Sequence, residues 1–202
     1  MKENIYNWQP LSVEEMYALF SNTSIDWFIA GGWALDLHVN KQTRNHSDID
    51  ICLYREDQNL LFQQLSKDWL FYKAQKGKLI HWAEGEFLQK TKDVWVRKDH
   101  HSPWAFQIML IDMEKGDWVY GREPSIRRAK DDIYLHTSSG IPYLKPEIQL
   151  LYKGGSSQVR EKDKTDFQMM LPYLTLEEKD WLRKALVRQF SNGHSWLRYL
   201  HH

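Results

Sequence analysis

A glycine pair between two apolar stretches constrains this chain more than any other feature. Residues 27–30 are bulky and apolar, as expected of a buried strand. Gly31 and Gly32 interrupt that run, and the apolar residues from Trp33 to Val39 then recur with roughly helical spacing. A glycine pair between a strand and a helix lets the backbone approach a ligand closely and directs N–H groups at an anion. We therefore expect a phosphate-binding turn here.

Two aspartates follow on a second predicted strand. Asp48 and Asp50 are separated by one residue, and residues two apart in a strand point to the same face of the sheet. Both carboxylates should therefore face one way, while Ile49 and Ile51 face the core. Magnesium usually binds through one or two carboxylates together with the phosphates of its substrate. The pair beside the glycine turn predicts a site for a nucleoside triphosphate with a divalent metal.

These motifs resemble those of the small antibiotic nucleotidyltransferases, the aminoglycoside and lincosamide adenylyltransferases of the DNA polymerase β superfamily. The resemblance rests on Gly31-Gly32-Trp-Ala-Leu-Asp-Leu and Thr43-Arg-Asn-His-Ser-Asp48-Ile-Asp50-Ile, and it extends to about residue 170. It implies an α+β fold, with a polymerase β-like mixed sheet flanked by helices and followed by a helical C-terminal region. It also implies transfer of a nucleoside monophosphate from ATP or another NTP to a hydroxyl of a small molecule, with one or two Mg²⁺ ions.

The resemblance further implies a third carboxylate on a strand next to the acid pair. Asp112 is the preferred candidate because it ends a long apolar run, where the family places its last acid. In this interpretation Asp48, Asp50 and Asp112 bind metal, and Asp112 takes the proton of the acceptor hydroxyl. Asp93 and Glu114 are weaker candidates. The alternative for Asp112 is an ordinary acidic residue at the start of a turn.

Four side chains are predicted to assist the glycine turn in binding the nucleotide. Arg44 and His46 lie in the loop before the acid pair, where the resembling family has a basic residue and a histidine. Arg44 could contact the triphosphate, and His46 could orient a carboxylate or hold the loop. Lys153 and Lys162 lie on neighbouring predicted helices, from which they could reach phosphates across a cleft. The alternatives are an ordinary surface loop for the first pair and exposed helix lysines for the second.

Composition excludes several classes of protein. A chain of 202 residues, 42% of them hydrophobic, has enough apolar material for a packed core. A formal net charge of zero argues against a nucleic-acid partner, which normally requires a basic face. The single Cys52 allows no internal disulfide, and no apolar run approaches the roughly 20 residues of a membrane span. We therefore expect a cytoplasmic protein without a membrane partner.

Two regions are predicted along the chain. Residues 1–120 contain strands and helices of a nucleotidyltransferase domain, and residues 121–202 form a mainly helical C-terminal region. Capping boxes at Ser12 and Thr175 mark the start of two of the helices.

The acceptor is the part of the function that the sequence constrains least. An aminoglycoside is a polycation and would require exposed acids, for which Glu84 and Glu86 are candidates. Two other functions stay open at this point. One is a transferase of the same superfamily that acts on RNA or protein, and the other is a non-catalytic nucleotide-binding protein that keeps the fold.

Overall fold

The fold is a mixed sheet with helices packed around it. The computed structural model describes residues 4–156 and 158–200. Its strands are β1 (Trp27–Ala30), β2 (Asp50–Tyr54), β3 (Leu70–Gln75), β4 (Lys78–His81), β5 (Asp93–Arg97), β6 (Trp104–Glu114), β7 (Asp117–Val119), β8 (Arg127–Ala129), β9 (Tyr134–His136) and β10 (Pro142–Leu144). Its α-helices are α1 (Val13–Phe20), α2 (Gly31–Val39), α3 (Gln58–Leu65), α4 (Pro146–Gly154), α5 (Glu161–Met170) and α6 (Leu176–Gln189).

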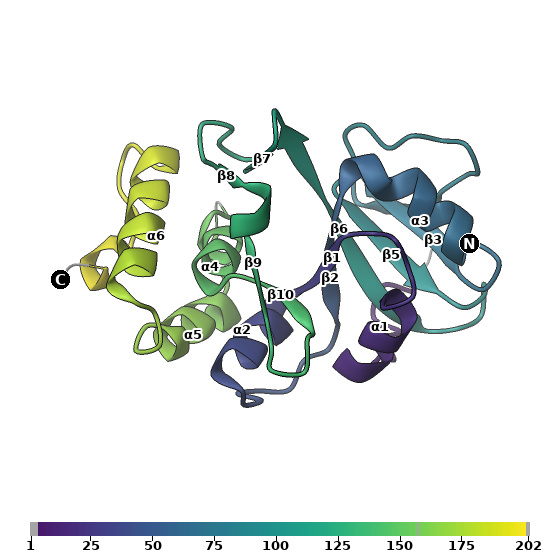
Figure 1. The fold of residues 1–202 in the computed structure, drawn as a ribbon, viewed down its shortest axis with the longest axis horizontal. Coiled ribbons are helices and arrows are strands. Elements are labelled where there is room, and N and C mark those ends of the chain that lie inside the picture. The colour runs from purple at the N-terminus through teal and green to yellow at the C-terminus, as the bar shows by residue number, and fades with distance from the viewer. Residues whose placement is uncertain (1–3, 157, 201–202) are drawn as a thin grey trace.

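Strand β2 lies near the middle of the sheet. The strand order is β4-β3-β5-β6-β2-β1-β10-β9, and β7 joins β6 to β8. Strand β2 pairs antiparallel with β1 and parallel with β6, so the predicted acid strand has a neighbour on each side. Helices α1 and α3 lie at one end of the molecule with β3 and β5, whereas α4, α5 and α6 form the other end (Figure 1). This arrangement confirms the predicted α+β class.

Local sequence signals explain where the helices begin. Both predicted capping boxes are present: the Ser12 side chain accepts from the Glu15 N–H at the start of α1, and the Thr175 side chain accepts from the Glu178 N–H at the start of α6. Pro146 occupies the first turn of α4, where its missing N–H costs no hydrogen bond. The apolar face of each helix is then buried against the sheet or another helix.

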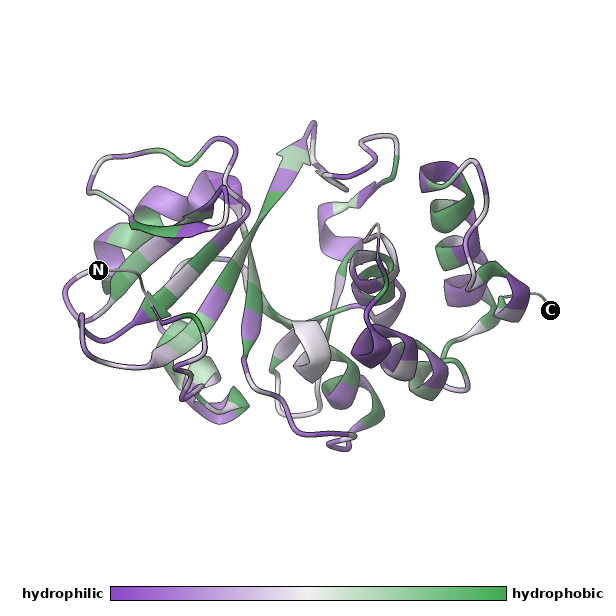
Figure 2. Ribbon diagram, turned by 180° about the vertical axis from the view of Figure 1, so that it is seen from behind, coloured by the Kyte–Doolittle hydropathy of each residue, from purple (hydrophilic) through white to green (hydrophobic). Residues whose placement is uncertain are grey.

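Strand β6 is the longest strand of the described chain, and its side chains alternate in character. Figure 2 shows hydrophobic and hydrophilic bands following one another along it. Phe106 and Ile108 are fully buried, while Gln107 and Met109 between them are only partly buried. One face of β6 therefore packs in the core and the other is open to a pocket, as the period of two in a strand requires.

The sheet continues past residue 120, where the sequence suggested a change to helix. Strands β8, β9 and β10 follow that point, and β10 pairs parallel with β1. Each is three residues long, which is too short to show an alternating pattern in the sequence. The helical part begins at α4, and α4 packs against α2, α5 and α6. In the described ranges, no helix is both long and apolar enough to cross a membrane.

Arg128 ties the sheet to this helical part, and its removal should destabilise the fold. Its guanidinium pairs with the buried carboxylate of Glu147 on α4 and lies 4.7 Å from the ring centroid of Trp181 on α6. Arg128→Ala leaves Glu147 buried without its counter-ion, so we expect the free energy of unfolding to fall by about 3 kcal/mol. Arg127 is the matched control because its pair with Glu114 is exposed; Arg127→Ala should cost under about 1 kcal/mol. Urea unfolding of both variants checks this, and equal losses would contradict it.

Candidate active site

The glycine pair forms the first turn of α2, directly after β1. Gly31 has φ of 67°, a conformation that a residue with a side chain adopts only with strain. A Cβ on Gly31 would collide with the carboxylate of Asp50, and one on Gly32 would collide with the ring of His46. The Gly31 N–H donates to Oε1 of Gln149 on α4 at 2.7 Å, so it is already satisfied within the protein. The glycines therefore allow the helix to begin in contact with the acid strand.

Three carboxylates line one wall of a pocket of about 220 Å³ beside this turn. They belong to Asp48, Asp50 and Asp93, and Gly31 and Gly32 line the same pocket. Burial, and next the charge of Asp48, raise the pKa of Asp50 to about 7. Two carboxylates this close repel each other, and a cation between them would relieve the repulsion. The predicted acid pair is thus brought together with the predicted glycine turn.

The register of the sheet explains how Asp93 joins this pair. Asp50 of β2 lies opposite Gln107 of β6, and Asp93 of β5 lies opposite Met109 of β6. Residues opposite each other share a face, and Gln107 and Met109 are two apart, so all four side chains point to the same side. Gln107 donates a hydrogen bond of 3.1 Å to Asp93. Burial raises the pKa of the Asp93 carboxyl, and this hydrogen bond partly opposes the shift.

Asp112, the preferred third acid from the sequence, is placed elsewhere. It lies five residues beyond Gln107 on β6, which corresponds to about 17 Å along a strand. Its carboxylate pairs with Arg55. The Arg55 guanidinium also donates to the carbonyl oxygens of Leu88 and Thr91 at 2.8 and 2.6 Å. Asp112 is therefore part of an ion pair outside the acid group, and Asp93 is the third carboxylate that lines the pocket.

Basic side chains from the loop and the C-terminal helices also line this pocket. Arg44, Lys153, Arg160 and Lys162 all contribute to its lining, together with Arg122. Three of these five cations were predicted from the sequence. Arg160 and Arg122 were not, because nothing in the sequence shows that the start of α5 and the segment after β7 meet at the acid strand. We call the three carboxylates the acidic wall of the pocket and these five cations its basic wall.

Two buried aspartates of α5 hold the basic wall in position. Asp166 accepts from Arg44 at 2.8 and 3.1 Å and pairs with Lys153 at 2.7 Å. Asp163 pairs with Arg160 at 2.6 Å and with Lys153 at 3.5 Å. Burial would raise the pKa of Asp166, but the hydrogen bond from Arg44 and the charge of Lys153 outweigh it and keep that pKa below its usual value. These cations are thus fixed before any ligand arrives.

His46 has a supporting position, whereas Lys162 is open to solvent. The Nε2 atom of His46 lies 2.6 Å from Oδ2 of the buried Asp36, and Oδ1 of Asp36 accepts from the Thr43 hydroxyl at 2.5 Å. His46 therefore lies against Gly32 and joins its loop to Asp36 of α2. It is absent from the pocket lining, and its part in nucleotide binding stays a prediction. Lys162 is exposed on α5 and lines the pocket.

The donor set of the acidic wall fits magnesium bound together with a substrate. Among residues 4–156 and 158–200, no group of three or more His, Cys, Asp or Glu side chains is close enough to enclose a metal by itself. Magnesium seldom uses such a cage; it binds through one or two carboxylates and takes its remaining ligands from phosphates and water. Asp48 and Asp50 supply two carboxylates, and the repulsion between them favours the binding of a cation.

Replacing Gly31 by alanine should damage the site more than the same change at an isolated turn. Gly77 is the matched control because it has φ of 72°, but a Cβ added to it would have nothing within 4 Å. Gly77→Ala should cost about 1 kcal/mol for the backbone conformation alone. Gly31→Ala should cost about 2–4 kcal/mol, because it adds the collision with Asp50, and it should abolish Mg²⁺-dependent ATP binding. Urea unfolding and calorimetric titration check this; equal effects on both measurements would contradict it.

Comparison with known proteins agrees with this geometry. A lincosamide resistance protein of Staphylococcus haemolyticus is 25% identical over 142 residues, which are 68% of this chain and 79% of that protein. The lincosamide antibiotic adenylyltransferase LnuA, solved with lincomycin bound, has a TM-score of 0.54 at 19% identity and covers 80% of this chain and 96% of its own. ANT(2'')-Ia in complex with adenylyl-2''-tobramycin has a TM-score of 0.55 at 12% identity, covering 86% and 93%. At these identities the two structures show a shared fold.

A family model places the chain among such enzymes. The model described as aminoglycoside-2''-adenylyltransferase matches residues 12–170. That range contains the glycine turn, the three carboxylates and both aspartates that hold the basic wall. Because the match covers most of the chain, this protein belongs to the aminoglycoside-2''-adenylyltransferase family and is a nucleotidyltransferase.

Proposed function

We propose that this protein transfers a nucleoside monophosphate from magnesium-bound ATP to a hydroxyl of a small acceptor of the aminoglycoside or lincosamide type. The observation that carries the proposal is the meeting of Asp48, Asp50 and Asp93 with a prearranged basic wall across one pocket. A triphosphate with a divalent cation matches both walls. Its negative phosphates complement the basic wall, and the positive cation complements the acidic wall.

The residues of the two walls have separate roles in this proposal. Asp48 and Asp50 would hold the metal. Its positive charge would stabilise the negative charge that develops on the phosphate oxygens. Lys162 and Arg160 are exposed on the basic wall and contact the phosphates, with Arg44 and Lys153 behind them in the ion-pair network. Most of the rate enhancement then comes from positioning and electrostatic stabilisation.

Asp93 is the general base of the proposed reaction. Its raised pKa suits a group that must accept a proton near neutral pH. The acceptor oxygen attacks the α-phosphorus, the bond from that phosphorus to the bridging oxygen breaks, and pyrophosphate leaves. The hydroxyl proton passes to the Asp93 carboxylate. Asp93 takes over the role that the sequence suggested for Asp112, because Asp93 lines the pocket with the acid pair and Asp112 does not.

Pyrophosphate release tests the proposal. The protein is incubated with ATP and Mg²⁺ in the presence of lincomycin, tobramycin, RNA or no acceptor. The mass of the acceptor is then measured by mass spectrometry. The proposal predicts release that requires a small acceptor, together with a gain of one AMP unit in the acceptor's mass. Release that requires RNA, or a mass gain on a protein, would instead support the macromolecular transferase. ATP binding without transfer to any acceptor would support the non-catalytic alternative.

A further inference from the structure

A second, smaller pocket shares Asp93 with the first. It has a volume of about 90 Å³. Asp93 lines both this pocket and the site between the acidic and basic walls, and so do Met109, Arg122 and Tyr152. The two pockets are therefore adjacent, and the proposed general base lines both of them.

The walls of this second pocket are largely apolar and held in place. Ile111 of β6, Val119 of β7 and Tyr120 after it are buried and line it. The Tyr120 hydroxyl donates to the Leu151 carbonyl at 3.3 Å, and the rings of Tyr120 and Tyr152 meet edge-on with centroids 5.3 Å apart. A rigid surface of this kind suits the face of a sugar ring or another partly apolar ring.

The charged groups at this pocket are unsuited to a polycation. Lys92 and Arg122 line it, and their described hydrogen bonds go to neutral acceptors: Lys92 to the Gly121 carbonyl, and Arg122 to the Tyr152 carbonyl and the Tyr120 hydroxyl. The carboxylates that line it are Asp93 and Asp112, and Asp112 is paired with Arg55. Lys92 and Arg122 also attract the Asp93 carboxylate. A ligand with several positive charges would therefore meet two cations and would compete with them for Asp93.

The two acids that the sequence offered for a polycation also lie outside this pocket. Glu86 pairs with Lys73 beside β3, and Glu84 is exposed in the loop after β4. Neither residue is part of the lining of either pocket described above.

We propose that this second pocket is the acceptor subsite, and that it takes a hydroxylated ring with an apolar portion and at most one positive charge. The inference rests on the proposed transferase function, and it selects between the two acceptor classes named there. A ring in this pocket places a hydroxyl beside Asp93, with the α-phosphorus in the neighbouring pocket. Lincomycin, with one basic amine, has this chemistry, whereas tobramycin is a polyamine.

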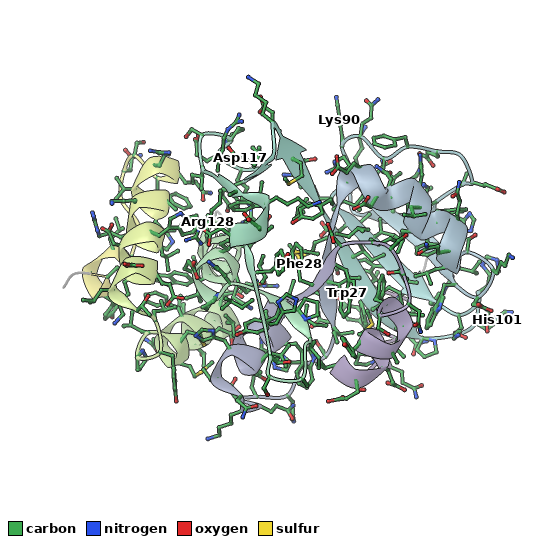
Figure 3. All side chains as sticks on the ribbon, viewed as in Figure 1. Trp27, Phe28, Lys90, His101, Asp117 and Arg128 are labelled. Atoms are coloured by element: carbon green, nitrogen blue, oxygen red, sulfur yellow. The ribbon has the colours of Figure 1, made fainter. Side chains whose placement is uncertain are left out.

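Two variants and one control test the subsite. Val119→Trp fills the pocket from β7, and Val119 is not part of the lining of the first pocket. Lys92→Glu reverses an exposed charge at the pocket, and Lys90→Glu makes the same change two residues earlier, where the side chain is exposed and outside both linings (Figure 3). Far-UV circular dichroism verifies folding; Lys92 is exposed, so that variant remains informative if Val119→Trp does not fold.

Acceptor binding and AMP transfer are measured separately, so that failure of the proposed subsite can be distinguished from failure of the proposed transferase function. We expect wild type to bind lincomycin at least about tenfold more tightly than tobramycin in calorimetric titrations with Mg²⁺ and a non-hydrolysable ATP analogue. Val119→Trp should weaken lincomycin binding at least about tenfold without changing the affinity for the analogue. Lys92→Glu should shift the preference toward tobramycin by about tenfold, and Lys90→Glu should leave it unchanged.

Several results would overturn the subsite. One is lincomycin binding that Val119→Trp does not weaken. Another is a preference of the wild type for tobramycin. A third is an equal effect of Lys92→Glu and Lys90→Glu on the preference between the two acceptors. Transfer to tobramycin that Val119→Trp leaves intact would reject the subsite while supporting the transferase. Lincomycin binding that Val119→Trp abolishes, without AMP transfer in wild type, would support the subsite and reject the transferase.

Discussion

Replacing Asp50 by asparagine is expected to lower acceptor-dependent pyrophosphate release by at least about a thousandfold. Asparagine keeps the size of the side chain but removes the charge that would hold a divalent cation beside Asp48. Asp50 is also the carboxylate closest to the first turn of α2, since a Cβ on Gly31 would overlap it. The loss should appear in the rate with saturating ATP and Mg²⁺, measured by steady-state kinetics.

The stability of the same variant separates lost chemistry from misfolding. In the metal-free protein, burial and the charge of Asp48 raise the pKa of Asp50 to about 7, so its ionised form is disfavoured by folding. Above pH 7 the wild-type group is charged in both the folded and the unfolded state, and the neutral asparagine side chain avoids that cost. Asp50→Asn should therefore unfold at a higher temperature than wild type at pH 8 without metal. The difference should shrink as pH falls below 7, because Asp50 is then protonated in the folded state. A less stable variant at pH 8 would contradict this account.

Asp93→Asn is expected to lower the transfer rate by about 100- to 10,000-fold, the usual range for loss of a general base. Asp112→Asn is the matched control, because it makes the same chemical change at the other candidate for the third carboxylate. Asp112 is paired with Arg55 and lies outside the lining of the pocket that holds the acid pair, so with saturating acceptor its replacement should change the rate less than about tenfold. Single-turnover transfer with saturating ATP checks both variants.

The opposite ranking of these two variants would contradict the assignment of the base. If Asp112→Asn abolished transfer and Asp93→Asn did not, the register of β5 and β6 would not describe the working enzyme. A loss in both variants, with normal unfolding curves, would mean that the Asp112–Arg55 pair positions the segment before Asp93. Arg55 contacts the carbonyl of Thr91, two residues before Asp93, so the unfolding curves and the ATP affinity would have to be compared as well.

The core of the site could be predicted from local sequence because its parts are close together in the chain. Gly31, Gly32, Asp48 and Asp50 lie within 20 residues of the sequence, and strand alternation predicted both carboxylates on one face. In the structure β2 begins only at Asp50, so Asp48 lies two residues before the strand, and both acids line the same pocket. The third carboxylate depends instead on the pairing of β5 with β6, and that register is a tertiary property. An acid at the end of a long apolar run was therefore a reasonable but insufficient signal for Asp112.

The far parts of the fold were harder to predict for a related reason. Strands β8, β9 and β10 are held by their partners and not by their own sequence pattern. His46 could be recognised as a notable residue, but its partner Asp36 lies on α2 and faces it only once the loop has folded back. Arg160 and Arg122 reach the pocket by the same kind of long-range packing.

The most direct test of the central claim is to locate the metal. Crystals grown with Mn²⁺ in place of Mg²⁺ and a non-hydrolysable ATP analogue would be measured for anomalous scattering, because manganese binds the same oxygen ligands. We expect a manganese peak between the carboxylates of Asp48 and Asp50, with the triphosphate lying between this peak and Lys162. A peak beside Asp112 and Arg55, or a nucleotide bound away from Gly31 and Gly32, would contradict it.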